Sequence, residues 1–104
     1  MYTSGVWIVK RGREDEFARR WQEGADASAL EFPDVKFSLF HDAGNPQRFL
    51  SLATGWRNEE QIEAARSTPS FQDSMAAMWR MLESGEVATL KLVAEVRFVL
   101  TVHL

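Results

Sequence analysis

Aromatic side chains are the residues of this sequence whose number and spacing suit a chemical role. Seven Phe, four Trp and one Tyr occur among 104 residues. Large rings form bulky cores, and they also line pockets for flat, apolar ligands. An apolar stripe also recurs at helical spacing, at Phe71, Met75, Met78, Trp79 and Leu82. Such a stripe is core in most proteins, so both interpretations stay open.

Several other kinds of chemistry lack the residues that they need. The chain has no cysteine and two isolated histidines, His41 and His103, so disulfides, thiolate catalysis and a metal cluster are not indicated. Its six glycines form no phosphate-binding or dinucleotide-binding pattern. We predict neither a metal ion nor a bound cofactor. His41 is a candidate base, but it stands beside a turn, where a histidine is more often a solvated side chain.

Composition indicates one globular domain over residues 1–104. The net charge is −3, and Lys and Arg are scattered among Asp and Glu, so we expect no nucleic-acid partner. No apolar run approaches the roughly 18 residues of a membrane span. The first residues lack the order of a signal peptide, and the absence of cysteine fits a reducing interior, so we expect a cytoplasmic protein.

Hydrophobic periodicity predicts four strands and two helical regions, the second of which is broken into two segments. The strands are expected at 4–10, 35–42, 48–56 and 87–104, and the helices at about 13–30, 58–66 and from 68 onward. Asn58 suits an N-cap with Gln61 completing a capping box, and Thr68 caps a second segment with Pro69 in its first turn. Gly85 is expected to end that segment.

The element order β-α-β-β-α-β predicts a ferredoxin-like fold of the α+β class with an antiparallel sheet. We expect right-handed crossovers to make the first and third strands parallel neighbours, with the second and fourth strands outside them.

Both faces of the expected sheet are apolar. Val6 and Ile8 oppose Trp7 and Val9 in the first strand; in the third, Leu50, Leu52 and Trp56 oppose Phe49 and Ala53. Helices cover one face only, so we expect a second copy to cover the other. The last strand is more than twice the usual length over residues 89–104 alone, and this part is expected to exchange with the partner. The alternative is a monomer with an irregular tail.

Four segments resemble the antibiotic biosynthesis monooxygenase (ABM) superfamily of dimeric α/β-barrel proteins. They are "VKRGREDEF", "HDAGNPQRF", "GWRNEEQIEA" and "STPSF", in this order between about Gly5 and Val96. The resemblance implies a homodimer with facing sheets and a cleft in each protomer between helices and sheet. It also implies activities such as cofactor-independent oxidation of phenolic or quinol-like substrates, or haem degradation.

Trp56 matches the strand-ending tryptophan of that family. There it can wall the cleft and offer its indole N–H, or it can fill the gap between strand and helix. Other side chains expected at the cleft are Trp21, Phe37, Ser51, Phe71, Met75 and Trp79. Ser51, Ala53 and Gly55 either leave space for a ligand or let the partner's sheet approach.

The sequence departs from the active branches at two places. Family monooxygenases tend to carry Asn on the strand before the tryptophan, where this chain has Leu50 and Leu52. Haem-degrading relatives need a histidine that "SFQDSMAAMW" lacks, so we expect no haem turnover. The polar candidates for activating a substrate are His41, Arg66, Ser51 and Thr54.

Three functional interpretations follow. The first is a cofactor-independent monooxygenase that acts on an aromatic or polyketide-like small molecule, with Trp56 and His41 as its catalytic candidates. The second is a non-catalytic dimer that binds a hydrophobic small molecule. In the third, the protein's own side chains Trp21, Phe71 and Trp79 fill the cleft.

Overall fold

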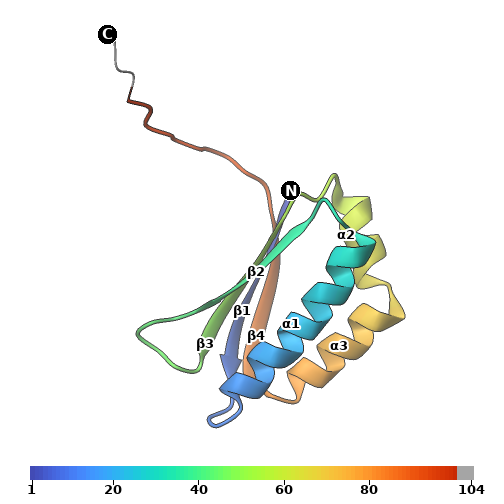
Figure 1. Cartoon of the computed structure of the whole chain (residues 1–104), viewed down its shortest axis with the longest axis vertical. Coiled ribbons are helices and arrows are strands. Elements are labelled where there is room, and N and C mark those ends of the chain that lie inside the picture. Colours follow the sequence, from blue (N-terminus) through green and yellow to red (C-terminus); the bar gives the residue numbers. More distant parts are fainter. Residues whose placement is uncertain (101–104) are drawn as a thin grey trace.

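The computed structural model describes residues 1–100 of the chain. Its elements are β1 (Tyr2–Val9), α1 (Glu14–Glu31), β2 (Lys36–His41), β3 (Arg48–Thr54), α2 (Glu59–Arg66), α3 (Pro69–Trp79) and β4 (Leu82–Leu90). The three helices lie on one side of a four-stranded sheet (Figure 1). The expected ferredoxin-like α+β fold is confirmed, and the sheet of this chain is open rather than closed into a barrel.

The strand order is β2-β3-β1-β4, so the predicted neighbours are correct. The predicted parallel pairing of the first and third strands is wrong, because β1 and β3 pair antiparallel, with Thr3 opposite Ala53 and Gly5 opposite Ser51. The reason is topological. A crossover through α1 makes β1 and β2 parallel, and the hairpin then reverses the chain so that β3 runs against both.

Local signals start both short helices as predicted. The Asn58 side chain accepts the backbone N–H of Gln61, and Thr68 accepts that of Phe71. The carboxamide of Gln61 reaches back to the N–H of Arg57, one residue before the N-cap. These bonds satisfy donors that helix termini leave unpaired.

The end of α3 differs from the prediction. The helix stops at Trp79, and both Leu82 and Gly85 belong to β4. Leu82 is buried because the strand starts on the core side, in phase with the helical stripe. Gly85 lies opposite Trp7 and leaves room for that ring: a Cβ on Gly85 would stand 2.8 Å from it.

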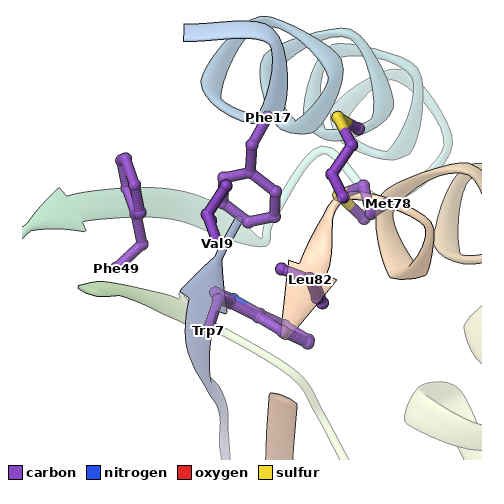
Figure 2. Close-up of a cluster of buried hydrophobic side chains, with 7 residues drawn as sticks. Trp7, Val9, Phe17, Phe49, Met78 and Leu82 are labelled. Carbon is purple, nitrogen blue, oxygen red and sulfur yellow. The ribbon is translucent and has the colours of Figure 1, made fainter. Parts of the chain in front are cut away.

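Two buried clusters lie between the sheet and the helices. Trp7, Val9, Phe17, Phe49 and Met78 belong to the first, with Phe17 of α1 pointing down onto β1 (Figure 2). The second consists of Val35, Ala53, Trp56, Ile62 and Ala65. The helix-covered face of the sheet therefore carries the core.

Trp56 belongs to this helix-covered face, so its predicted place beside Leu50 and Leu52 is wrong. Gly55 has a φ of +99° and interrupts the alternation of strand residues. The turn rotates Trp56 toward Ala53 and Ile62. Its indole N–H donates to Thr3 Oγ1 at 3.1 Å, which fixes the ring against β1.

The opposite face of the sheet has no cover within the described residues. Val6, Ile8, Leu50 and Leu52 share this open face and are only half-buried. Phe40, paired with Leu50, is 55% exposed. A sheet face on which apolar side chains lie together without cover is typical of an association surface.

The predicted final strand is too long for the single chain. β4 ends at Leu90, which pairs with Tyr2, and the chain then runs away from the body without regular structure to residue 100 (Figure 1). β1 begins at Tyr2, so no residue of β1 is left to pair with the chain beyond Leu90. The part of the prediction that concerns 101–104 lies outside the described residues.

Candidate functional site

A cavity of about 150 Å³ lies between the sheet and the three helices. Six residues predicted for the cleft line it: Trp21, Phe37, Ser51, Trp56, Phe71 and Met75. They come from α1, β2, β3, the segment before α2, and α3, so only the tertiary fold brings them together. The cavity is open to solvent, and the side chains expected to fill it leave it unfilled.

Aromatic rings shape one wall of the cavity. Trp56 meets Phe37 edge to face at 6.0 Å and Phe32 at 5.5 Å between ring centroids. Edge-to-face and tilted contacts of this kind add to the stabilisation from burial. Trp56 is 7% exposed, so the ring is a fixed wall that packs and lines the cavity at the same time.

Trp7 also lines the cavity, and the sequence did not single it out as a site residue. Its indole lies close to glycines of two strands: a Cβ on Gly5 would stand 2.2 Å from the ring, and one on Gly85 2.8 Å from it. The signal in the sequence was a glycine within each of two strands, Gly5 and Gly85, because glycine within a strand often marks close approach of another group. That this group is the Trp7 ring follows only from the register that places Gly85 opposite Trp7.

Two of the three tryptophans in the cavity wall, Trp7 and Trp56, donate their indole N–H to a hydroxyl. Trp7 Nε1 donates to Ser51 Oγ at 3.0 Å, and Trp56 Nε1 donates to Thr3 Oγ1 at 3.1 Å. Both hydroxyls line the cavity. The N–H that Trp56 was expected to offer is therefore engaged within the protein. Ser51 and Ala53 leave space on the cavity side of the sheet, rather than on the open face.

Arg66 is the charged residue among the described residues that line the cavity. One guanidinium nitrogen donates to Thr89 Oγ1 at 3.4 Å, and another lies 3.6 Å from a carboxylate oxygen of Glu63. Carboxylates and imidazoles are absent from this described lining. The cavity thus presents donors and one cation to a ligand, and its rings supply apolar contact.

Three predicted candidates lie outside the cavity. His41 stacks on Phe49 at 4.3 Å, and its Nε2 donates to the Pro46 carbonyl at 2.7 Å, at the exposed end of the hairpin. Thr54 pairs with Tyr2 on the open face. Trp79 is 45% exposed and meets the edge of Trp7 without lining the cavity.

The hairpin around His41 is held by its neighbour Asp42. Its carboxylate accepts the N–H of Gly44 and pairs with Arg48 at 3.1 Å. The Gly44 hydrogen bond, followed by the one from Arg48, lowers the pKa of Asp42 below its usual range. Arg48 therefore has a structural partner at the surface.

Replacing Gly24 by Ala is expected to stabilise the protein by about 0.5–1 kcal/mol, because Gly weakens a helix interior. An added methyl would meet Ser74 Oγ at 3.5 Å, an ordinary contact between α1 and α3. Urea unfolding measures the change. Gly12→Ala is the matched control and should destabilise, because Gly12 has a φ of +86°. A loss of stability in Gly24→Ala would show that α1 and α3 pack too tightly for a methyl group.

Comparison with known families matches residues 5–77 to the family described as "Antibiotic biosynthesis monooxygenase". This match covers more than half of the chain, and the chain belongs to that family. No curated protein matches. Within residues 1–100, no group of three His, Cys, Asp or Glu side chains could hold a metal ion, and none of the described helices is both long and apolar enough to cross a membrane.

Solved structures support the same fold. One, described as an antibiotic biosynthesis monooxygenase, has a TM-score of 0.78 at 17% identity and covers 89% of this chain and 98% of its own. A candidate member from Deinococcus radiodurans has a TM-score of 0.80 at 12% identity, covering 94% and 97%. A Pseudomonas aeruginosa protein reaches 0.75 at 16%, covering 89% and 93%. At these identities the likeness concerns the fold.

Proposed function

We propose that this protein is a cofactor-independent monooxygenase for a small aromatic molecule. The observation that carries the proposal is a ring-lined cavity whose described lining offers hydroxyls and the cation Arg66 but no carboxylate or imidazole. Such a lining suits a ligand that enters as its own oxyanion, a phenolate or an enolate. The ligand is then electron-rich, and preorganised donors stabilise its charge.

The reaction draws its electrons from the ligand. A phenol and O₂ give a quinone and water: one oxygen atom forms a new C=O bond at a ring carbon, and the O–O bond breaks. The other oxygen atom leaves as water with the hydrogen of that carbon and one proton from solvent, which replaces the proton that the phenol lost on ionisation. The protein's residues bind the oxyanion, orient the ring and exclude water.

The cavity size favours one ring within the protein. A cavity of about 150 Å³ lined by apolar side chains holds a molecule the size of benzene in another protein, and the present cavity has a volume of about 150 Å³. A polycyclic ligand would extend past Ala27 and Ser70, which line the cavity and are exposed. We therefore favour the single-ring end of the expected aromatic and polyketide-like range.

A second candidate function is binding without turnover. The same absence of a titratable base from the described lining favours it, because most acid–base catalysts place such a group beside the ligand. In that case the protein holds a hydrophobic small molecule for another component of a pathway.

Oxygen uptake with single-ring phenols separates these two functions. We expect uptake with a pH profile that follows the ionisation of each phenol, moving to lower pH for a more acidic phenol, because the ligand carries the titrating group. Measurement with an oxygen electrode at several pH values, using two phenols of different acidity, tests this. Saturable binding without uptake would select the second function, and a profile fixed for both phenols would show that a protein group is the base.

We further propose that two copies of the chain form a homodimer, with the cytoplasm as its location because the chain has no cysteine. Proteins of this family are generally dimeric. The open face supplies the surface, and the tail supports the pairing. The even-numbered residues from Leu90 onward continue the open-face register of β4 and are all apolar: Leu90, Leu92, Ala94, Val96, Phe98 and Leu100. A tail with this alternation suits a strand that faces the partner's sheet.

A further inference from the structure

Two hydroxyls face the cavity from adjacent antiparallel strands. Thr3 of β1 lies opposite Ala53, and Ser51 of β3 lies opposite Gly5, so the hydroxyls occupy diagonal positions on one face of the sheet. Each one accepts an indole N–H, from Trp56 and Trp7 respectively. Both hydroxyls also line the cavity.

The protons of these two hydroxyls have no assigned acceptor in the protein. An indole nitrogen only donates, so Thr3 and Ser51 act as acceptors in these bonds and keep their own O–H protons. Three other hydroxyls do donate within the protein: Ser67 to the Glu63 carbonyl at 2.7 Å, Thr68 to the Ala65 carbonyl at 2.9 Å and Ser70 to Thr68 Oγ1 at 3.4 Å. Among residues 1–100, no such donation occurs from Thr3 or Ser51. Their protons are therefore free for a group in the cavity.

The two indoles hold these hydroxyls in fixed positions. Trp7 is 4% exposed and lies over the backbones of Gly5 and Gly85. Trp56 is held between the rings of Phe32 and Phe37. A hydroxyl that already accepts a hydrogen bond is polarised and becomes a better donor. The tryptophans thus improve and orient donors without offering their own N–H groups.

We propose that Thr3 and Ser51 bind the oxyanion of the ligand through their hydroxyl protons, and that Trp56 and Trp7 are positioning residues. This inference rests on the proposed binding of an aromatic oxygen compound and assigns the groups that recognise its oxygen. Arg66 adds a positive charge from α2. The expected ligand carries an ionisable oxygen on a ring, and an ether of the same ring binds without these bonds.

The probe is 4-nitrophenol, whose phenolate absorbs visible light, with 4-nitroanisole as the uncharged comparison. The wild-type protein is expected to bind the phenolate more tightly than the ether and to lower the pKa of the bound phenol. Absorbance titration of pH gives that pKa with and without protein. Arg66→Gln tests the contribution of the positive charge. The loss of phenolate affinity in this variant should shrink with added salt more than the loss caused by removing a hydroxyl.

Four variants test the hydroxyls and their supports. Thr3→Val and Ser51→Ala should each weaken phenolate binding about tenfold or more, because a hydrogen bond to a charged group is lost. Binding of 4-nitroanisole should change little. Thr3→Ser should retain the phenolate preference because it keeps the hydroxyl. Trp7→Phe should reduce the preference, because Ser51 then loses the indole N–H that orients its hydroxyl.

Unchanged phenolate preference in folded Thr3→Val and Ser51→Ala would overturn the inference, and equal loss of phenolate and ether binding would do so too, since it would indicate a packing role. Wild-type protein that binds neither probe also overturns it. If the variants lose the preference as expected but wild-type protein consumes no oxygen with any phenol, the inference stands and the monooxygenase proposal fails. If oxygen uptake persists in both hydroxyl variants, the monooxygenase proposal stands and the proposed role of the two hydroxyls fails.

Discussion

Replacing Leu50 by Lys is expected to convert the protein from a dimer into a monomer. Leu50 lies near the middle of the open face, between Val6 of β1 and Phe40 of β2. In the proposed dimer the partner's sheet covers this position, and an unpaired ammonium group would be removed from water there. The association constant should fall by a factor of about 100 or more, because burying an unpaired charge costs several kcal/mol.

Light scattering after size exclusion at micromolar concentration measures the effect. The wild-type mass should be twice the 11.9 kDa of one chain, and the mass of the variant should equal one chain. Leu30→Lys is the matched control: Leu30 is 87% exposed at the end of α1, away from the open face. It should keep the wild-type mass.

Truncation after Leu90 is an independent test of the same interface. It leaves the folded domain intact and removes the apolar tail, so it should weaken the dimer without unfolding the chain. A wild-type protein of single-chain mass would contradict the dimer directly. A Leu50→Lys protein that stays dimeric would place the interface elsewhere.

Replacing Gly55 by Ala is expected to destabilise the protein by about 2–5 kcal/mol, since two independent costs add. The φ of +99° at Gly55 disfavours any side chain. In addition, a Cβ would stand 2.2 Å from the carbonyl oxygen of Asp34, which is backbone and cannot rotate away. This loss is a large part of the stability of an ordinary domain, about 5–15 kcal/mol.

Thermal unfolding should show a fall in Tm of at least about 10 °C for Gly55→Ala. Gly44→Ala is the control, because its Cβ would meet Asp42 Oδ1 at 3.5 Å and its φ is not positive. That variant should change Tm little. A Gly55→Ala protein as stable as the control would mean that the turn before Trp56 relaxes easily, and that the glycine does not place the ring.

Local signals in the sequence determined much of the fold. Asn58 and Thr68 cap their helices because a short polar side chain can reach the first backbone N–H groups without help from distant residues. The alternation of the strand residues also indicated an uncovered face, because it places apolar side chains on both sides of the sheet while the helices cover one side only. Element order then limited the topology to a ferredoxin-like fold.

Side-chain direction at the ends of elements was less predictable. Leu82 continues the helical stripe of α3 in phase, yet it begins a strand. Trp56 continues the alternation of β3 in sequence, yet Gly55 turns it to the other face. In both cases the period of one element was extended across a boundary where the backbone changes conformation.

The sequence by itself determined the family, the element types and the supply of aromatic side chains. Only the tertiary structure decided which of them share the cavity, that Trp7 is among them and His41 is not, and that Thr3 and Ser51 receive the indole N–H groups. The physical reason is distance along the chain. Thr3 and Trp56 are 53 residues apart and Trp7 and Ser51 are 44 apart, so strand register and a left-handed glycine, rather than local propensity, bring each pair together.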